Sequence, residues 1–173
     1  SLYLLRLFII FHDCGHGSFF KSKFLSEWTG RIMGMFTFTP YAFWTKQHAL
    51  HHANTGNLSK RGNGDVFVMT VREYQASPLF IRFSYRIFRN PFFLFFVGGP
   101  LLFLVVHRFP WYVPLRNFRI WVSVWSFNLA ITGFIVLVSW MTSLGQVLVV
   151  YLPAIYLSTV AGTWMFYVQH QFE

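Results

Sequence analysis

Two long uncharged apolar runs dominate the second half of the chain. They cover residues 120–141 and 146–168, and only the short stretch 142–145 separates them. A helix rises about 1.5 Å per residue, so roughly 20 apolar residues cross the hydrocarbon core of a bilayer. The pattern therefore predicts two transmembrane helices joined by a tight turn.

The first half of the chain alternates shorter apolar runs with polar segments. Residues 2–11 are apolar apart from Arg6 and would form about 15 Å of helix, which is half of a bilayer core. We interpret this run as the last half of a transmembrane helix that delivers His12 to one membrane face. The run 32–44 is also short and contains Pro40, so we expect it to dip into the interface rather than to span.

Arginines recur on one face of the segment 78–91. Arg82, Arg86 and Arg89 follow one another at intervals of four and three residues, among phenylalanines and isoleucines. Residues at this spacing share one side of a helix. The segment is therefore predicted to be a basic amphipathic helix that lies on the membrane surface. A surface helix packed on protein is the alternative.

The apolar run 92–106 decides the topology. It is shorter than a usual span, and its Gly-Gly-Pro sequence at 98–100 predicts a break in the helix. If the run is re-entrant, only the two later runs cross, and all histidine clusters share one membrane face. The loop after the run contains Arg108 and Arg116, so the positive-inside rule places that face in the cytoplasm.

Composition and charge agree with a membrane protein. Hydrophobic residues make up 55% of the chain and charged residues only 11%, against about 25% charged in ordinary globular domains. The net charge of +9 suits either nucleic acid or an anionic membrane surface. Because residues 120–168 carry no charge at all, we interpret the basic residues as membrane anchors and expect no nucleic-acid partner.

Both ends of the chain are unusual. It begins at Ser1 without a methionine and enters an apolar run at once, and it stops at Glu173 directly after another apolar run. We interpret the sequence as a piece of a longer protein. The single cysteine, Cys14, excludes an internal disulfide.

Histidine placement carries the chemistry. The first pair is four residues apart, and the next three are spaced by three and four, so each group occupies one face of a helix. Imidazoles placed in this way can point at a common metal ion. Six of the seven histidines form the candidate set: His12, His16, His48, His51, His52 and His170.

The ligand types narrow the choice of metal. Zinc proteases use H-E-x-x-H with the Glu as general base, whereas residues 47–52 read QHALHH and contain no Glu. Imidazole-rich sites without thiolate suit iron, copper, zinc or nickel. Six ligands exceed what one zinc ion would use, so we predict two metal ions. Iron explains the set best if the chemistry is oxidation.

The neighbours of the first histidine pair have predicted supporting roles. Asp13 is expected to hold the imidazole of a ligand such as His12 by its second N–H, rather than to bind metal itself. Cys14 is expected to be a small packing residue rather than a ligand or nucleophile. Gly15 and Gly17 either allow close approach of another helix or mark a loosened helix end.

These segments resemble the histidine boxes of membrane fatty-acid desaturases. Residues 12–20 (HDCGHGSFF) are similar to the first box and residues 48–58 (HALHHANTGNL) to the second. The ending 166–173 also resembles the acyl-lipid branch, which includes bacterial and plant Δ12 (omega-6) enzymes. The resemblance covers essentially the whole chain, 1–173. The family's third box, of the form H-x-x-H-H, is absent from this chain, so the fragment alone is expected to be incomplete.

The resemblance implies the fold, the activity and the partners. The fold is all-α, a single truncated domain of integral membrane helices with a cytosolic, histidine-rich di-iron cap. The activity is oxygen-dependent desaturation of a lipid-linked acyl chain, of the Δ12 or omega-6 type. The six histidines hold two iron ions, dioxygen is the co-substrate, and the electron donor is a ferredoxin or a cytochrome. The expected location is the bacterial cytoplasmic membrane.

Further residues are expected to be structural under this interpretation. Asn54 and Asp65 follow the second box and are predicted to be turn residues rather than ligand-orienting groups. His107 matches no box. Small residues in the last run are expected to serve helix packing rather than to line an acyl channel. These small residues are Ala154, Ser158, Ala161 and Gly162.

Three other functions remain open on the sequence. A related di-iron membrane hydroxylase or carotenoid ketolase would use the same histidines. A transition-metal transporter would place its ligands near the bilayer midplane on broken helices, whereas these histidines flank polar segments. A membrane-anchored binding protein that has lost catalysis is the third.

Overall fold

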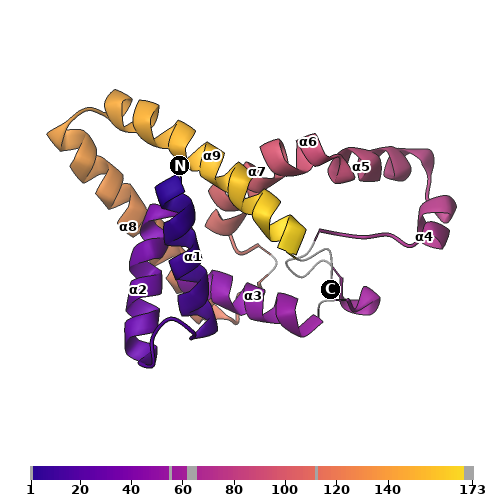
Figure 1. Cartoon of the computed structure of the whole chain (residues 1–173), viewed down its shortest axis with the longest axis horizontal. Coiled ribbons are helices and arrows are strands. Elements are labelled where there is room, and N and C mark those ends of the chain that lie inside the picture. The colour runs from indigo at the N-terminus through magenta and orange to yellow at the C-terminus, as the bar shows by residue number, and fades with distance from the viewer. Residues whose placement is uncertain (1, 55, 62–65, 112, 170–173) are drawn as a thin grey trace.

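The computed structural model describes residues 2–54, 56–61, 66–111 and 113–169, and its regular elements there are all helical, as predicted (Figure 1). In chain order they are α1 (Leu2–His16), α2 (Lys23–Phe36), α3 (Tyr41–Asn54), η1 (Leu58–Lys60), α4 (Val71–Ala76), α5 (Leu79–Arg89), α6 (Pro91–Phe93), η2 (Leu94–Gly98), α7 (Gly99–Leu104), η3 (Val106–Arg108), α8 (Phe118–Met141) and α9 (Leu144–Gln169).

Helices α1, α2 and α3 form the first packed unit. Helix α1 pairs with α2 along its length, and α3 packs against the ends of both (Figure 1). Their common core consists of Phe11 and Cys14 from α1 and Tyr41 and Trp44 from α3. The buried position of Cys14 confirms the prediction that it is a packing residue.

Local sequence determines where these helices end. Gly17 closes α1 with a φ of 68°, and its N–H donates to the Cys14 carbonyl while the Ser18 N–H donates to the Asp13 carbonyl. This paired bonding is the Schellman motif, in which glycine adopts the left-handed conformation without a Cβ penalty. Pro40 directly precedes α3. The run 32–44 is therefore divided between two helices, in agreement with the prediction that it does not span.

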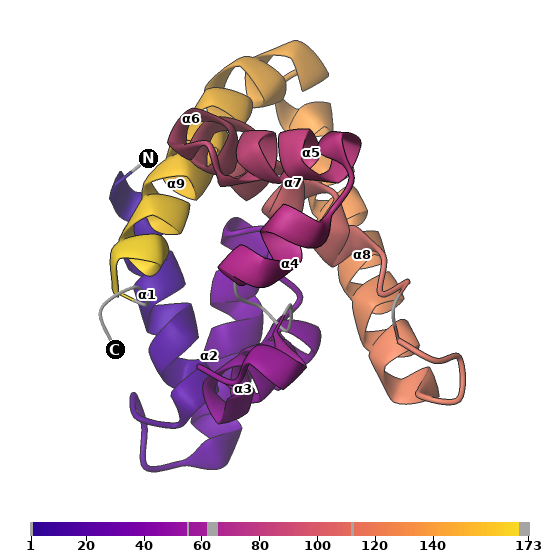
Figure 2. The ribbon, with the colours of Figure 1, turned by 90° about the vertical axis from the view of Figure 1, so that its right-hand side faces the viewer.

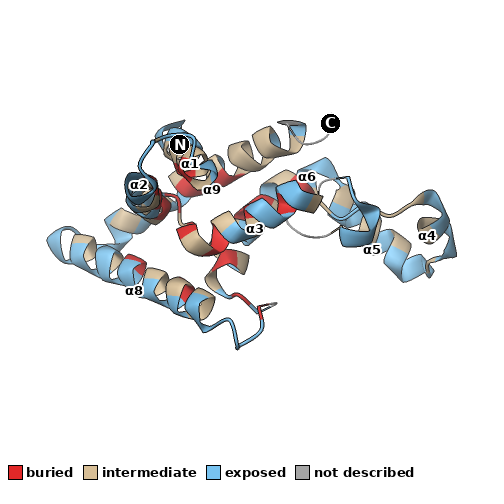
Figure 3. Cartoon of the chain, turned by 90° about the horizontal axis from the view of Figure 1, so that it is seen from below, coloured by how far each residue is buried: buried red, intermediate tan, exposed pale blue. Residues whose placement is uncertain are grey.

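Helices α8 and α9 are joined by a short turn and spread apart from it as a V (Figure 2). They contain 24 and 26 residues, which corresponds to about 36 and 39 Å of helix. Most side chains of α8 are exposed or only partly buried (Figure 3). Apolar helices of this length with exposed surfaces are suited to lipid, and both are long and apolar enough to cross a membrane.

The predicted helix break at residues 98–100 is wrong. Helical backbone continues from Pro91 to Leu104, and the segment Pro91–Arg108 is a third stretch long and apolar enough to cross. The helix accommodates Pro100 by widening into the π-helical turn η2, in which the Gly99 N–H donates to the Leu94 carbonyl.

A tyrosine from α9 compensates for the proline. Pro100 has no N–H, so the Phe96 carbonyl four residues earlier loses its usual helical partner. The Tyr156 hydroxyl donates to that carbonyl at 2.9 Å. Backbone groups inside a membrane must be satisfied by the protein, so this bond allows a proline-containing helix at this depth.

The surroundings of the two ends of Pro91–Arg108 indicate whether this segment crosses the membrane or re-enters it. Near its start, the Arg89 guanidinium lies over the Tyr167 ring at the C-terminal end of α9. Near its finish, the His107 ring contacts the Phe43 ring of α3. Both ends of the segment therefore lie near helices that carry or contact the histidines. This arrangement favours re-entry over a full crossing of the membrane. Re-entry remains a prediction.

Loss of the Tyr156 hydroxyl should destabilise the protein. The variant Tyr156→Phe leaves the Phe96 carbonyl without a donor, at a cost of about 1–3 kcal/mol. Thermal unfolding of the detergent-solubilised full-length protein should show a lower Tm by several degrees. Tyr3→Phe, at a tyrosine that is 81% exposed, is the control and should leave the Tm unchanged. Equal Tm values for both variants would contradict the assignment.

Helices α4 and α5 form an arm that projects from the rest of the molecule (Figure 1), and this arm points toward the viewer in Figure 2. The predicted helix is confirmed, but its arginines face α4: the Arg82 Nε donates to the Ser77 carbonyl and the Arg86 Nε to the Tyr74 hydroxyl. The apolar side, including Phe80 at 74% exposure, is left open. This open apolar side suits the membrane interface.

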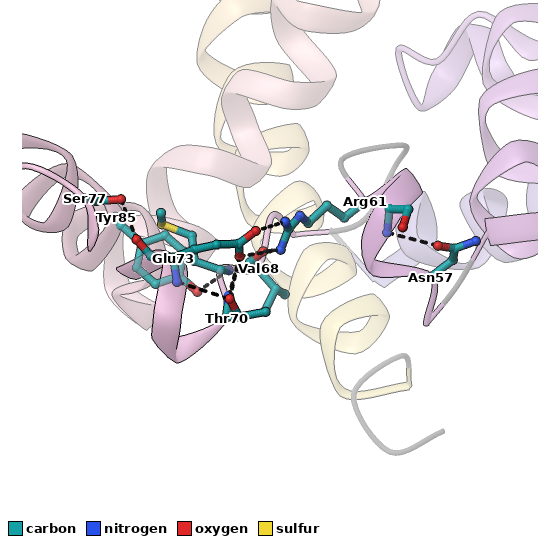
Figure 4. A network of polar contacts seen from close by, with 9 residues as sticks. Asn57, Arg61, Val68, Thr70, Glu73, Ser77 and Tyr85 are labelled. Atoms are coloured by element: carbon teal, nitrogen blue, oxygen red, sulfur yellow. Dashed lines mark hydrogen bonds and ion pairs between the residues drawn. The ribbon is translucent and has the colours of Figure 1, made fainter. Parts of the chain in front are cut away.

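An ion pair ties the arm to the segment after α3. The Arg61 guanidinium donates to both carboxylate oxygens of Glu73, which also accepts from the Thr70 N–H and hydroxyl (Figure 4). These bonds, with that from Arg61 the largest cause, lower the pKa of Glu73 to about 2. Stability from this carboxylate is therefore complete above its ordinary pKa and is lost as the pH falls toward about 2.

Neutralising Glu73 should loosen this connection. In Glu73→Gln the Arg61 side chain loses its charged partner, so trypsin should cut after residues 60 and 61 about threefold faster or more in the full-length protein. Mass spectrometry of timed digests measures the rates. Arg72→Gln changes a neighbouring exposed charge and should leave these two cleavages unaffected. If the two variants were cut at the same rate, the ion pair would not be the restraint.

Candidate metal centre

Four of the predicted histidines converge between α1 and α3. His12 and His16 come from the last turns of α1, and His48 and His52 come from the C-terminal half of α3. One ring nitrogen from each lies within 4.8 Å of the others. The helical spacing of four residues in each pair is what turns both rings of a pair toward the same point.

The nitrogens are arranged as ligands rather than as hydrogen-bond partners. The Nε2 atoms of His12, His16 and His48 form a triangle with sides of 3.0 to 3.2 Å. A neutral imidazole nitrogen offers either one N–H or one lone pair, so protons cannot bridge all three sides. A metal ion bound about 2.0–2.1 Å from each nitrogen would separate them by about 3 Å. The residues present therefore fit a metal ion.

The environment keeps the central histidine neutral. Burial, and then the positive charge that the neighbouring imidazoles would carry, lower the pKa of His48 to about 3. A metal ligand must present a lone pair, and a histidine that stays uncharged at physiological pH does so without first losing a proton. The surroundings therefore leave His48 unprotonated, with a lone pair available to a ligand.

Close approach of α1 and α3 creates the cluster. A Cβ at Gly15 would lie only 2.9 Å from the Trp44 ring and 3.1 Å from the Thr45 methyl group. Glycine thus allows α3 to pack directly against the end of α1, which is one of the two roles predicted for it. The Trp44 ring also stacks on the His48 ring, at a centroid distance of 4.3 Å and an angle of 18°.

Asp13 lies beside the first histidine. Its Oδ1 is 3.2 Å from the Nδ1 of His12. A carboxylate only accepts, so this contact places the proton on Nδ1 and leaves the Nε2 lone pair directed at the cluster. The geometry is compatible with the supporting role predicted for Asp13, which remains a prediction.

The other two predicted ligands lie differently. His51 is buried, and its ring centroid is 6.0 Å from that of His48 and 5.4 Å from that of His52, outside the group of four. His170 falls outside the described residues. Phe166, near the end of α9, contacts the His51 ring at 5.5 Å, so this end of α9 reaches the histidines.

Two aromatic residues at the cluster were missed by the sequence prediction. Trp44 stacks on His48, and Phe166 contacts both His48 and His51. A pattern pointed to Trp44, because it precedes His48 by four residues and so shares its helix face. Nothing local pointed to Phe166, whose contact depends on how α9 packs.

The remaining candidates have structural surroundings. The Asn54 side chain donates to the Leu50 carbonyl at 2.7 Å, as a helix-end residue does, and Asp65 lies outside the described residues. His107 is buried against Phe103, away from the group of four. Among the small residues of α9, Gly162 faces α1, because a Cβ there would lie 3.6 Å from Leu5. The packing role of the other small residues remains a prediction.

Comparison with known proteins identifies the family of the chain. The family model described as fatty acid desaturase matches residues 1–173. A fatty acid desaturase of Bacillus subtilis (strain 168) is 40% identical over 99% of this chain and 48% of its own length. The chain thus spans about half the length of that relative. No solved structure matches.

Two relatives from Synechocystis sp. (strain ATCC 27184 / PCC 6803 / Kazusa) match shorter stretches. An sn-1 acyl-lipid omega-3 desaturase (ferredoxin) is 52% identical over 30% of this chain and 14% of its own length. An sn-1 oleoyl-lipid 12-desaturase is 34% identical over 51% of this chain and 25% of its own length. With a family match along its whole length and four converging histidines, this chain belongs to the fatty acid desaturase family.

Proposed function

We propose that this chain is the part of a membrane desaturase that carries the first two histidine boxes. The full protein would introduce a double bond into a lipid-linked acyl chain at a di-iron centre. The observation that carries the proposal is the convergence of four imidazole nitrogens from α1 and α3, in a member of this family.

The proposed ligands divide between two ions. His12, His16, His48 and His52 surround one point and would hold one iron. His51 lies 5.4 to 6.0 Å from its neighbours by ring centroids. With His170 and ligands supplied by the rest of the protein, it would hold the second.

Iron is proposed because of the reaction. A mid-chain methylene has no activating neighbour, so acid–base groups cannot remove its hydrogen, and a bound iron pair supplies the required oxidising power. Dioxygen, two electrons, two protons and the –CH₂–CH₂– unit give –CH=CH– and two water molecules. The electrons require a donor of the ferredoxin or cytochrome type. The omega-3 relative from Synechocystis is named as a ferredoxin enzyme, which supports the former.

The chain's own residues would position the ligands and limit access of water. Trp44 fixes the plane of the His48 ring by stacking. Asp13 would hold His12 in one tautomer. Phe166 covers His48 and His51 from the side of α9. These rings cover only the side of His48 and His51, because His16 and His52 are exposed.

The membrane side on which the histidines lie and the position of the new double bond are also proposals. The basic loop 107–119 and the turn 142–145, which lacks Lys and Arg, favour a cytoplasmic position for the histidines in a bacterial membrane. The 12-desaturase relative, which matches the longer stretch, supports a Δ12 (omega-6) product, whereas the omega-3 relative has the higher identity, 52% against 34%, over a shorter stretch.

Metal content tests the ligand assignment. In the purified full-length protein, His48→Gln should remove about half of the bound iron or more, because the ligand at the centre of the cluster is lost. Mass spectrometry of the metals measures the content. His107→Gln makes the same chemical change at a buried histidine outside the group of four, and it should retain the iron. Iron retained in His48→Gln, or lost equally in both variants, would contradict the assignment.

Product analysis tests the activity. The full-length gene expressed in a host that lacks polyunsaturated lipids should yield a fatty acid with one additional double bond, located by gas chromatography and mass spectrometry of derivatives. His48→Gln should abolish the product. A product that gained one oxygen atom would identify a hydroxylase instead. Unchanged fatty acids in cells containing the iron-loaded protein would overturn desaturation.

A further inference from the structure

A polar hollow of about 350 Å³ lies beside the metal centre, between the end of α1 and the start of α2. The residues that line it include His16, Lys21, Lys23, Glu27, Tyr41 and Thr45. Small-molecule sites have volumes of about 300–1,000 Å³. The hollow is therefore large enough for a small polar group close to the histidines.

Two lysines at this hollow have no partner among the described residues. Lys21 and Lys23 are exposed, and neither ammonium group has a hydrogen bond or an ion pair there. Glu27 follows Lys23 by one helical turn, yet the two form no salt bridge. The positive groups at the hollow thus outnumber the negative one, and they are available to a ligand.

The lysines also occupy an unfavourable position for a helix. Lys21 and Lys23 flank the N-terminus of α2, whose first turn contains no acidic residue. The N-terminal end of a helix carries partial positive charge, so cations there are destabilising and anions are stabilising. An anion held between these lysines would offset the repulsion.

The exposed apolar face of helix α2 indicates where the hollow lies relative to the membrane. Phe24, Trp28 and Ile32 recur every four residues and are exposed to 67, 54 and 49%. The Arg31 guanidinium lies over the Trp28 ring. An exposed apolar stripe bordered by a cation and a tryptophan is typical of a helix at the membrane interface, where lipid phosphates lie.

We propose that this hollow binds the phosphate group of the phospholipid whose acyl chain enters the metal centre. The proposal rests on the proposed function, because it assigns the substrate's head group to a place beside His16. A concave site of this size fits one head group, whereas a protein electron donor binds through a broader surface, up to about 600 Å² per partner for a transient electron-transfer complex.

Binding of short-chain lipids tests the proposal. Calorimetry on the purified full-length protein in an uncharged detergent compares dihexanoyl phosphatidylglycerol with dihexanoylglycerol, which lacks the phosphate. The phosphate-bearing lipid should bind about tenfold more tightly or better. Equal affinity for the two would overturn the proposal. Glycerol phosphate without acyl chains should bind more weakly, and equal affinity for it would identify a free phosphate site instead.

Charge variants locate the binding. The double variant Lys21→Gln, Lys23→Gln should weaken the phospholipid about tenfold or more, whereas Glu27→Gln should strengthen it severalfold by removing the opposing charge. Lys46→Gln with Arg72→Gln removes the same charge from exposed positions outside the hollow and should change affinity less than about twofold. Equal losses in the two double variants would overturn the assignment to this hollow.

This experiment separates the two proposals. Binding is measured without dioxygen or reductant and therefore does not depend on turnover. A protein that binds the phospholipid through Lys21 and Lys23 but makes no unsaturated product would support the head-group site and count against desaturation. A protein that desaturates lipids, but binds both short-chain lipids equally, would retain the activity and lose the site.

Discussion

The direct packing of α3 on the end of α1 determines the rest of the structure. Gly15 offers no side chain, so the Trp44 ring can lie against the α1 backbone. The same ring contacts Phe11 at 4.8 Å and stacks on His48 at 4.3 Å. One buried aromatic residue thereby links the apolar core of the first three helices to the geometry of the metal centre. Burying a ring of this size also contributes several kcal/mol to the stability of the unit.

Much of this architecture was predictable because it depends on local periodicity. The spacings of four residues in His12–His16 and His48–His52 determine which side of each helix bears the rings, and the structure places both pairs at one point. The two long apolar helices followed in the same way from run length. What the sequence did not reveal were contacts between distant segments, such as Phe166 on His51, because no local pattern encodes how α9 packs.

The error at residues 98–100 has a specific physical origin. A proline was expected to end the helix because it removes one hydrogen bond and crowds the preceding turn. The chain instead widens by one residue into a π turn, and the exposed carbonyl of Phe96 is satisfied by Tyr156 from another helix. The compensation lies 56 residues beyond the proline by sequence number. The acceptors of the arginines on α5 were likewise not predictable from local spacing, since Ser77 and Tyr74 of the α4 region supply them.

The position of the metal centre follows from two opposing solvent requirements. Imidazoles and the Asp13 carboxylate are costly to place in hydrocarbon, whereas an acyl chain is costly to expose to water. Helices α8 and α9 supply the lipid-facing surface, and the end of α9 brings Phe166 to the histidines. The centre therefore lies where the apolar hairpin ends and the polar helix ends of α1 and α3 begin. At this boundary the acyl chain of the proposed substrate would reach the histidines without either group leaving its preferred solvent.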